Sequence, residues 1–176
     1  MNFFSIFKKC TPFVQVALGV ACVLGCLPGA QALEKPKGAV VLTVSGQLSQ
    51  VNEGKTAVLS IPMLNQLPQR SVFTKSPWYP AGAEFTGPLL RDVLKAVGAK
   101  GKTITAYALN DYKTEIPLDD AIKYDVILAH LMNGKPMAVR DKGPLFVVYP
   151  FDAVPELQTQ VYYNRSAWQV AHLHIN

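Results

Sequence analysis

The alternation of apolar and polar positions over residues 33–176 predicts a chain made mostly of strands. Short runs rich in β-branched and apolar residues, bounded by Gly, Pro, Asn or Asp, are typical of strands. Such runs span residues 39–44, 56–61, 71–75, 103–109, 113–116, 126–132, 136–139 and 169–175. Asn133-Gly134, between two of them, is the strongest short signal for a hairpin. We therefore expect several antiparallel strand pairs.

Helical spacing is clearest after Gly87-Pro88. Proline at the first helical position costs nothing, because its missing N–H would have no intrahelical partner there. An apolar stripe at helical spacing follows, formed by Leu89, Leu90, Val93, Leu94 and Val97. Gly98 ends the helix. Shorter helices or turns are expected over 62–67, 117–123 and 160–168.

Two further stretches complete the predicted topology. Residues 76–85 hold two prolines and a glycine, and this composition predicts a loop. Residues 145–149 are apolar at every position, which favours a central strand buried on both faces. Strands dominate without regular strand–helix alternation. The predicted fold class is therefore α+β, with mixed β-sheets and short helices in one domain over 33–176.

The first 32 residues have the organisation of a secretory signal peptide. Two lysines precede an apolar run over 13–27, and Ala30-Gln31-Ala32 supplies an A-x-A cleavage site. At about 15 residues the run is short for a membrane span, which needs roughly 20. We expect cleavage after Ala32 and a periplasmic domain. Two alternatives stay open, a lipoprotein anchored at Cys26 and a retained anchor.

Charge and cysteine content exclude several classes of function. Lys8 and Lys9 are the only charged residues of the leader, and residues 33–176 keep 15 basic and 12 acidic side chains. This balance argues against a nucleic-acid partner, which needs a dense basic face. The three cysteines, Cys10, Cys22 and Cys26, all precede residue 33. The domain thus has no thiolate for a metal, no disulfide and no cysteine nucleophile.

Four segments, in order, resemble one family. They are Phe-Thr-Gly-Pro-Leu-Leu-Arg-Asp-Val-Leu at 85–94, Ala-Leu-Asn-Asp-Tyr at 108–112, Arg-Asp-Lys-Gly-Pro-Leu at 140–145 and Arg-Ser-Ala-Trp-Gln at 165–169. Together they are similar to the small secreted members of the sulfite-oxidase-type molybdopterin-binding domain. The similarity covers about residues 40–175 and implies that family's fold and a pterin-type pocket.

The resemblance also draws attention to a missing residue. In molybdenum enzymes with this fold, a cysteine sulfur binds the metal on the strand and loop before the helix that starts here at Gly87-Pro88. The corresponding stretch, 71–78, contains no cysteine, and Lys75 sits about where the sulfur is expected. A protonated lysine has no lone pair to offer a metal. The residues therefore deny the family's usual metal chemistry.

What the resemblance implies about function follows from this departure. Some small family members bind a metal-free pterin in the periplasm and report it to a membrane receptor that controls cyclic-dinucleotide turnover. The leading hypothesis is a non-enzymatic, periplasmic pterin-binding protein, with a reduced or oxidised pterin as ligand and a membrane receptor with cyclic-dinucleotide or kinase output as partner. The second is a molybdopterin-dependent oxidoreductase subunit without a cysteine ligand. The third is a scaffold that has lost its ligand.

A pterin is a flat bicyclic ring, so its site needs a planar side chain against one face and polar groups along one edge. Stacking of a nucleobase on an aromatic ring is worth roughly 1–3 kcal/mol. Trp78 and Tyr79 are predicted to stack, although Trp78 fits a hydrophobic plug almost as well. Asp111, beside Tyr112, is predicted to accept from the ring's amino group, with an Asx-type turn as the alternative.

Basic residues complete the predicted ligand-binding set. Arg140 and Lys142 are expected to hold a phosphate or a hydroxylated tail, with solvated side chains at Arg140 and Asp141 as the alternative. Arg165 lies one helical turn before Trp168, so its guanidinium is expected to stack on the indole. The alternative is that Arg165 and Trp168 form a structural pair that pins the last strand.

The histidines and serines suggest no catalytic or metal site. His172 and His174 share one strand face, but a closed zinc site takes four ligands, and no further ligands can be nominated. We interpret this pair as an exposed edge face, and His130, within an apolar strand, as a core histidine. No serine lies in the Gly-x-Ser-x-Gly elbow of a nucleophile.

Overall fold

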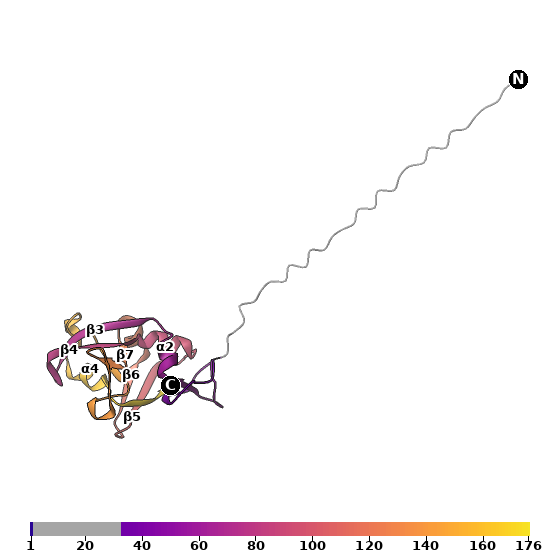
Figure 1. Cartoon of the computed structure of the whole chain (residues 1–176). Coiled ribbons are helices and arrows are strands. Elements are labelled where there is room, and N and C mark those ends of the chain that lie inside the picture. The colour runs from indigo at the N-terminus through magenta and orange to yellow at the C-terminus, as the bar shows by residue number, and fades with distance from the viewer. Residues whose placement is uncertain (2–32) are drawn as a thin grey trace. The chain divides into compact units, whose positions relative to one another are not determined.

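The computed structural model describes Met1 and residues 33–176 (Figure 1). The predicted signal peptide, its cleavage site and the three cysteines lie outside the described residues. In the part of the chain that is described, no helix is both long enough and apolar enough to cross a membrane.

The larger sheet has five strands in the order β2-β1-β11-β5-β6. Its members are β1 (Val40–Gly46), β2 (Ala57–Ser60), β5 (Thr103–Ala108), β6 (Lys113–Pro117) and β11 (Val170–Ile175). β1 and β11 pair in parallel, whereas the other neighbours pair antiparallel. The sheet is therefore mixed, as the sequence predicts, and the last strand of the chain lies at its centre.

Two smaller antiparallel sheets complete the strand content. One has the order β3-β4-β8-β9 and the other pairs β10 with β7. The strands are β3 (Gln69–Ser76), β4 (Tyr79–Pro88), β7 (Ile127–Ala129), β8 (Leu131–Met132), β9 (Lys135–Pro136) and β10 (Phe146–Val148). In Figure 1, β3 and β4 form a long hairpin along one side of the domain.

The helices are short. They are α1 (Ile61–Leu64), α2 (Leu90–Ala96), α3 (Leu118–Lys123) and α4 (Gln160–Arg165), together with single 3₁₀ turns at Val139–Asp141 and Pro155–Leu157. The predicted α+β class with mixed sheets and short helices is confirmed. Among the described helices, α2 carries the apolar stripe of a core helix, and its residues Leu90 and Val93 are fully buried, as is Val97 at its end.

Two hydrophobic cores lie inside the domain. The larger packs the inner face of the five-stranded sheet, including Leu42, Ile104 and Leu173, against the stripe of α2. The smaller core lies around Phe85 and Phe146. Fully burying an apolar side chain of this size contributes about 1.5–3 kcal/mol, so both cores are substantial. Partly buried aromatic side chains ring the smaller core, and these position the candidate site.

The predicted loop over 76–85 is wrong, because most of it belongs to β4. Along this segment Ala83 and Phe85 are buried while Glu84 between them is exposed, which is the period of two of a strand. That alternation outweighs the proline and glycine signals. Only Pro77 and Trp78 form the turn, since Ser76 pairs with Tyr79 across it.

Two other predictions need correction. Helix α2 begins at Leu90, and Pro88 is instead the last residue of β4. Residues 145–149 do not form the centre of a large sheet, because in the part of the chain that the structure describes β10 and β7 form a two-stranded sheet of their own. The apolar run has a different cause: Phe146 and Val148 face the smaller core, and the residues between and beside them face the larger one. The hairpin at Asn133-Gly134 is confirmed, with both residues at positive φ.

Gly87, in one of the segments that carry the family resemblance, is required by a close crossing of backbones. A Cβ at this position would collide with the carbonyl oxygen of Leu128 and lie 2.7 Å from Cα of Ala129, both in β7. Backbone atoms cannot swing aside as a flexible side chain can. Glycine therefore lets β4 and β7 pack against each other.

We expect Gly87→Ala to lower the free energy of unfolding by about 1–3 kcal/mol, the usual cost of overpacking a core. Gly134→Asn is the matched control, because nothing lies within 4 Å of its Cβ position and asparagine tolerates positive φ. Urea denaturation measures both. Equal losses in the two variants would show that the crossing at Gly87 is not the constraint.

Candidate functional site

Five aromatic side chains from distant parts of the chain meet at the edge of the smaller core. We call this group the aromatic cluster. Its members are Trp78 from the β3–β4 turn, Tyr112 from the β5–β6 turn, Phe146 of β10, Tyr163 of α4, and Trp168 just before β11. Three of them, Trp78, Tyr112 and Trp168, belong to the predicted ligand-binding set.

Trp168 is the centre of the cluster. Trp78 meets it edge to face, with ring centroids 5.1 Å apart. The ring of Tyr112 lies nearly parallel to it, at an angle of 8° and a centroid distance of 6.4 Å. The ammonium of Lys142 lies 4.1 Å from the centroid of the Trp168 ring, a cation–π contact. Lys142 is thus a fourth predicted residue that the structure brings into the cluster.

Backbone contacts fix Trp168 and Lys142 relative to each other. Trp168 forms an isolated bridge with Phe146, which ties it to the smaller core. Lys142 has a φ of 71°, and its carbonyl accepts the backbone N–H of Gln169 at 3.0 Å. The side-chain amide of Gln169 also donates to the carbonyl of Val139 at 2.7 Å. The loop that carries Lys142 is therefore attached to the residue that follows Trp168.

Tyr112 is an accessible ring of the cluster, with 42% of its surface exposed. Its hydroxyl donates to the backbone carbonyl of Asn164 at 2.8 Å, which fixes the ring. Asp111, one residue earlier, is exposed and has a φ of 63°. The side chain of Asn110, not of Asp111, accepts the N–H of Tyr112 in this turn. The Asx-type turn therefore belongs to Asn110, and the contact of Asp111 with a ligand stays a prediction.

Tyr79 packs behind the cluster. Its ring meets Phe85 edge to face at 5.3 Å and lies against the smaller core. Burial, and to a smaller extent the charge of Asp141, raises the pKa of the Tyr79 phenol above its usual value. The hydroxyl therefore stays protonated at neutral pH and can donate a hydrogen bond.

Lys75 and Arg140 lie at the surface. Lys75 is exposed and lines a depression of about 370 Å³ together with Pro77, Asp152 and Tyr163. Because Tyr163 also belongs to the aromatic cluster, the depression adjoins it. Arg140 is 88% exposed, with its Nε 3.6 Å from a carboxylate oxygen of Asp141. This geometry matches the solvated alternative for Arg140, and its contact with a ligand stays a prediction.

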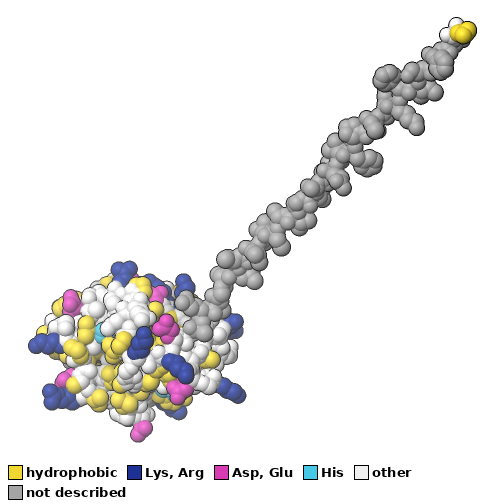
Figure 2. All heavy atoms as spheres, turned by 45° about the vertical axis from the view of Figure 1, so that its right-hand side comes forward, with side chains coloured by type: hydrophobic (Ala, Val, Ile, Leu, Met, Phe, Trp, Pro, Cys, Tyr) yellow, Lys and Arg dark blue, Asp and Glu magenta, His cyan; other side chains and the backbone are white. Residues whose placement is uncertain are grey.

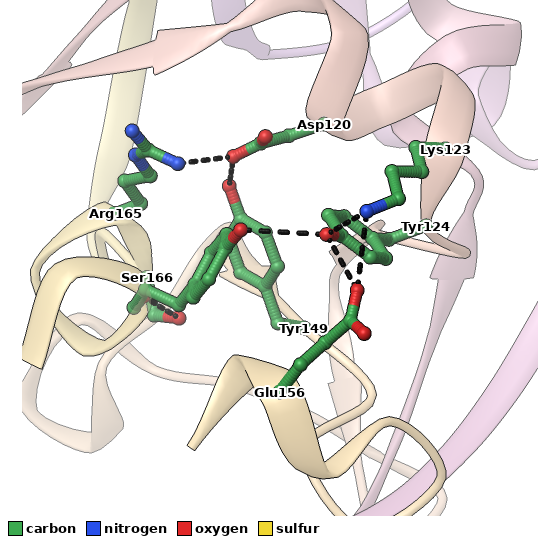
Figure 3. A network of polar contacts seen from close by, with 8 residues as sticks. Asp120, Lys123, Tyr124, Tyr149, Glu156, Arg165 and Ser166 are labelled. Carbon is green, nitrogen blue, oxygen red and sulfur yellow. Dashed lines mark hydrogen bonds and ion pairs between the residues drawn. The ribbon is translucent and has the colours of Figure 1, made fainter. Parts of the chain in front are cut away.

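The predicted stacking of Arg165 on Trp168 is wrong. The guanidinium of Arg165 lies over the ring of Tyr162, 5.1 Å from its centroid, and donates to a carboxylate oxygen of Asp120 at 2.9 Å. Figure 3 shows that the hydroxyl of Tyr149 donates to the same oxygen, also at 2.9 Å. A buried carboxylate needs such partners, and Asp120 draws Arg165 away from the indole. Lys142 takes the place on Trp168 that was expected for Arg165.

A second group of polar side chains lies beside the one around Asp120 and reaches the surface. The hydroxyl of Tyr124 and the ammonium of Lys123 both donate to a carboxylate oxygen of Glu156, at 2.9 and 3.1 Å (Figure 3). These bonds lower the pKa of Glu156 below its usual value. In the buried group around Asp120, burial raises the pKa of the Tyr149 phenol far above its usual range, and the charge of Asp120 raises it further. Asp120 therefore accepts its hydrogen bond from a neutral phenol.

Two members of the cluster were not predicted from the sequence. Phe146 sits in an apolar run, where nothing distinguishes a ring at a site from a core residue. Tyr163 lies in a helix of one and a half turns, and its neighbour Tyr162 points into the polar network instead. The predicted core role of His130 is confirmed, because it is buried and bonds to the side chain of Gln69 at 3.1 Å.

A family model, described as the oxidoreductase molybdopterin binding domain, matches residues 42–153. The chain belongs to this family. The match covers three of the four segments that carry the resemblance. The fourth, at 165–169, lies beyond it, as do Tyr163 and Trp168 of the aromatic cluster.

The fold has known counterparts among solved structures. One is the crystal structure of the sulfane dehydrogenase SoxCD from Paracoccus pantotrophus, with a TM-score of 0.56 and 21% identity over 76% of this chain. At that identity the likeness concerns the fold alone. The match spans 37% of the SoxCD chain, so that protein is much longer. A search of the curated proteins found no match.

The described residues can be compared with the cofactor that the family name implies. The aromatic cluster offers planar faces for a pterin ring. The donor set for molybdenum does not fit thiolate ligation, because residues 33–176 contain no cysteine and the hairpin of β3 and β4 carries Lys75 instead. Among the described residues, no three His, Cys, Asp or Glu side chains gather closely enough to hold a metal ion.

We expect Arg165→Leu to lower the free energy of unfolding by about 2–4 kcal/mol, because it leaves the carboxylate of Asp120 buried without its cation. Lys123→Ala is the control. It removes an ion pair of similar length, but both of its partners are largely exposed, and such pairs contribute little. Its denaturation curve should therefore overlay that of the wild type. Equal losses would contradict a structural role for Arg165.

Proposed function

We propose that this protein is a periplasmic pterin-binding module that works without thiolate-held molybdenum and reports its ligand to a membrane receptor. The observation that carries the proposal is the aromatic cluster. It lies in a domain of the molybdopterin-binding family whose β3–β4 hairpin offers Lys75 and no sulfur. A pterin ring needs flat apolar faces, and the cluster supplies them, whereas residues 33–176 lack the thiolate donor for the family's metal.

Tyr112 and Trp168 are the proposed stacking pair. Their planes lie within 8° of parallel, and their centroid distance of 6.4 Å is near the outer limit for a stacked pair. Tyr112 is exposed and held through its hydroxyl, so a planar ring can reach this pair from solvent. The neutral phenol of Tyr79 and the carboxylate of Asp111 are the proposed edge contacts.

Basic side chains around the cluster suit a polar or phosphorylated tail. Lys142 lies on the Trp168 ring, Arg140 precedes it by two residues, and Lys75 lines the adjoining depression. On the face drawn in Figure 2, Lys and Arg side chains are scattered rather than gathered into one patch. This distribution favours a small anionic group as ligand over an extended polyanion such as nucleic acid.

Export and signalling complete the proposal. The signal-peptide pattern of the first 32 residues supports the periplasm as location. The membrane receptor with cyclic-dinucleotide or kinase output is the partner that the family resemblance implies.

An oxidoreductase subunit is the second candidate. It is favoured by the family match itself and by the fold shared with a sulfane dehydrogenase. Fold and function are separable, however. In this alternative the molybdenum cofactor would be held through its pterin by the aromatic cluster, with no sulfur ligand from residues 33–176.

Pterin binding can be read from intrinsic fluorescence, because both tryptophans of the chain, Trp78 and Trp168, belong to the cluster. Titration with tetrahydrobiopterin, and separately with oxidised biopterin, should quench the emission in a saturable manner. Trp78→Phe and Trp168→Phe should each leave one tryptophan, and the pterin should still quench its emission. Unquenched emission with both probes would contradict the proposal.

Tyr112→Ala should weaken the Kd of the pterin about 5- to 150-fold, the equivalent of one lost stacking contact. Phe73→Ala is the matched control. Phe73 is also an exposed ring, 59% accessible, but in the part of the chain that the structure describes it pairs with no ring of the cluster. Its Kd should equal that of the wild type, and an equal loss in both variants would remove Tyr112 from the site.

Purification from native cells separates the two candidate functions. A pterin extracted without stoichiometric molybdenum supports the binding module, whereas stoichiometric molybdenum supports the oxidoreductase subunit. Protein free of any pterin, together with no quenching by the added probes, would contradict both.

A further inference from the structure

Helix α4 supports the aromatic cluster although none of its six residues is fully buried. Two of its residues reach the proposed site. The ring of Tyr163 belongs to the cluster, and the backbone carbonyl of Asn164 accepts the hydroxyl of Tyr112 at 2.8 Å. A carbonyl in the last turn of a helix has no intrahelical partner, so this hydroxyl satisfies it. The position of Asn164 therefore decides where the Tyr112 ring points.

The ring of Tyr112 depends on this hydrogen bond for its orientation. Its backbone is fixed in the β5–β6 turn, where its carbonyl accepts the N–H of Ala108 at 2.9 Å. The side chain extends from this turn and is exposed. Such a side chain can adopt several rotamers on a fixed backbone. The bond to Asn164 selects the one in which the ring lies within 8° of parallel to Trp168.

Trp168, the other ring of the proposed stacking pair, is anchored to β10. It forms the bridge with Phe146, and the carbonyl of Ala167 just before it accepts the N–H of Val147 at 2.9 Å. Ala167 is fully buried. Trp168 is therefore the fixed ring of the pair, and the geometry of the pair is set by Tyr112.

A half-buried ion pair holds the end of α4 at which Asn164 lies. Arg165, the next residue, donates to a carboxylate oxygen of Asp120 at 2.9 Å, and the two side chains are 23% and 10% exposed (Figure 3). Tyr149, fully buried, donates to the same oxygen and fixes it within the domain. Hydrogen bonds between charged groups are stronger than those between neutral groups, and burial protects them from screening by salt.

We propose that Asp120 and Arg165 are positioning residues of the pterin site. Their ion pair fixes the end of α4, the carbonyl of Asn164 at that end orients Tyr112, and the Tyr112 ring meets the ligand. The two charged groups thus act on the ligand only through Tyr112. This inference rests on the proposed function, because Tyr112 and Trp168 are the stacking pair of the proposed site.

The test is a double-mutant cycle on the full chain, measured as the Kd of tetrahydrobiopterin from tryptophan quenching. Tyr112→Phe keeps the ring, removes its hydroxyl and should weaken the Kd about 2- to 12-fold, the equivalent of one hydrogen bond. Asp120→Asn removes the charge that holds Arg165 and should weaken the Kd within the same range. The double variant should bind no more weakly than the weaker single variant, because both changes break one link.

A second measurement needs no ligand. The indole N–H of Trp168 gives one signal in a ¹⁵N NMR spectrum, assigned by its loss in Trp168→Phe. An aromatic ring shifts the resonances of protons beside it, so Tyr112→Phe and Asp120→Asn should move this signal in the same direction. A loss of global stability alone would not move the signal of molecules that remain folded.

Lys123→Ala is the matched control for both measurements. It removes an ion pair of similar length, between partners that are largely exposed, and should leave the Kd and the indole signal unchanged. Circular dichroism checks that each variant folds. Should Asp120→Asn not fold, Arg165→Lys takes its place in the cycle with the same expectations, because lysine keeps the charge and loses the planar fork of the guanidinium.

The inference fails if the losses of the two single variants multiply in the double variant. It also fails if Asp120→Asn leaves both the Kd and the indole signal as in the wild type. With a wild type that the pterin quenches, either result leaves the proposed function standing. A wild type that is not quenched contradicts the proposed function, and the ligand role of the ion pair fails with it.

Discussion

The burial of β10 on both of its faces is the constraint on which the rest of the structure depends. Phe146 and Val148 fill the smaller core, while Val147 and the adjoining Tyr149 fill the larger one. The same short segment therefore joins the two cores. From it, Phe146 reaches the aromatic cluster and Tyr149 reaches Asp120. Four consecutive residues thus tie the candidate site to both cores.

Much of this fold is readable from local patterns. The strands of the main sheet, the stripe of α2 and the hairpin at Asn133-Gly134 each carry their own periodicity or turn chemistry, so they were predictable. The β3–β4 hairpin was not, because Pro77, Pro80 and Gly82 resemble a loop. Only pairing with β3 on one side and packing of Phe85 on the other reveal the strand.

The candidate site, too, could be predicted from the sequence only in part. Trp78, Tyr112, Lys142 and Trp168 were named from the sequence, and the structure brings them together. Arg165 was assigned to the wrong ring, because spacing within a helix cannot reveal a buried carboxylate 45 residues earlier in the chain. In the same way, the sequence led us to interpret His172 and His174 as an edge face, which is wrong because β11 is the central strand of its sheet. It also did not reveal that both side chains contact Ser45. Ser45 lies 127 residues before His172, and only the parallel register brings them together.

The ammonium of Lys142 on the Trp168 ring has a consequence for ligand choice. Any flat guest that takes this indole face either displaces a resident cation or lies next to it. A guest that carries positive charge of its own is repelled, while a neutral or anionic heterocycle gains from the same side chain. In the proposed site, Lys142 would thus favour neutral or anionic rings over cationic rings of the same shape.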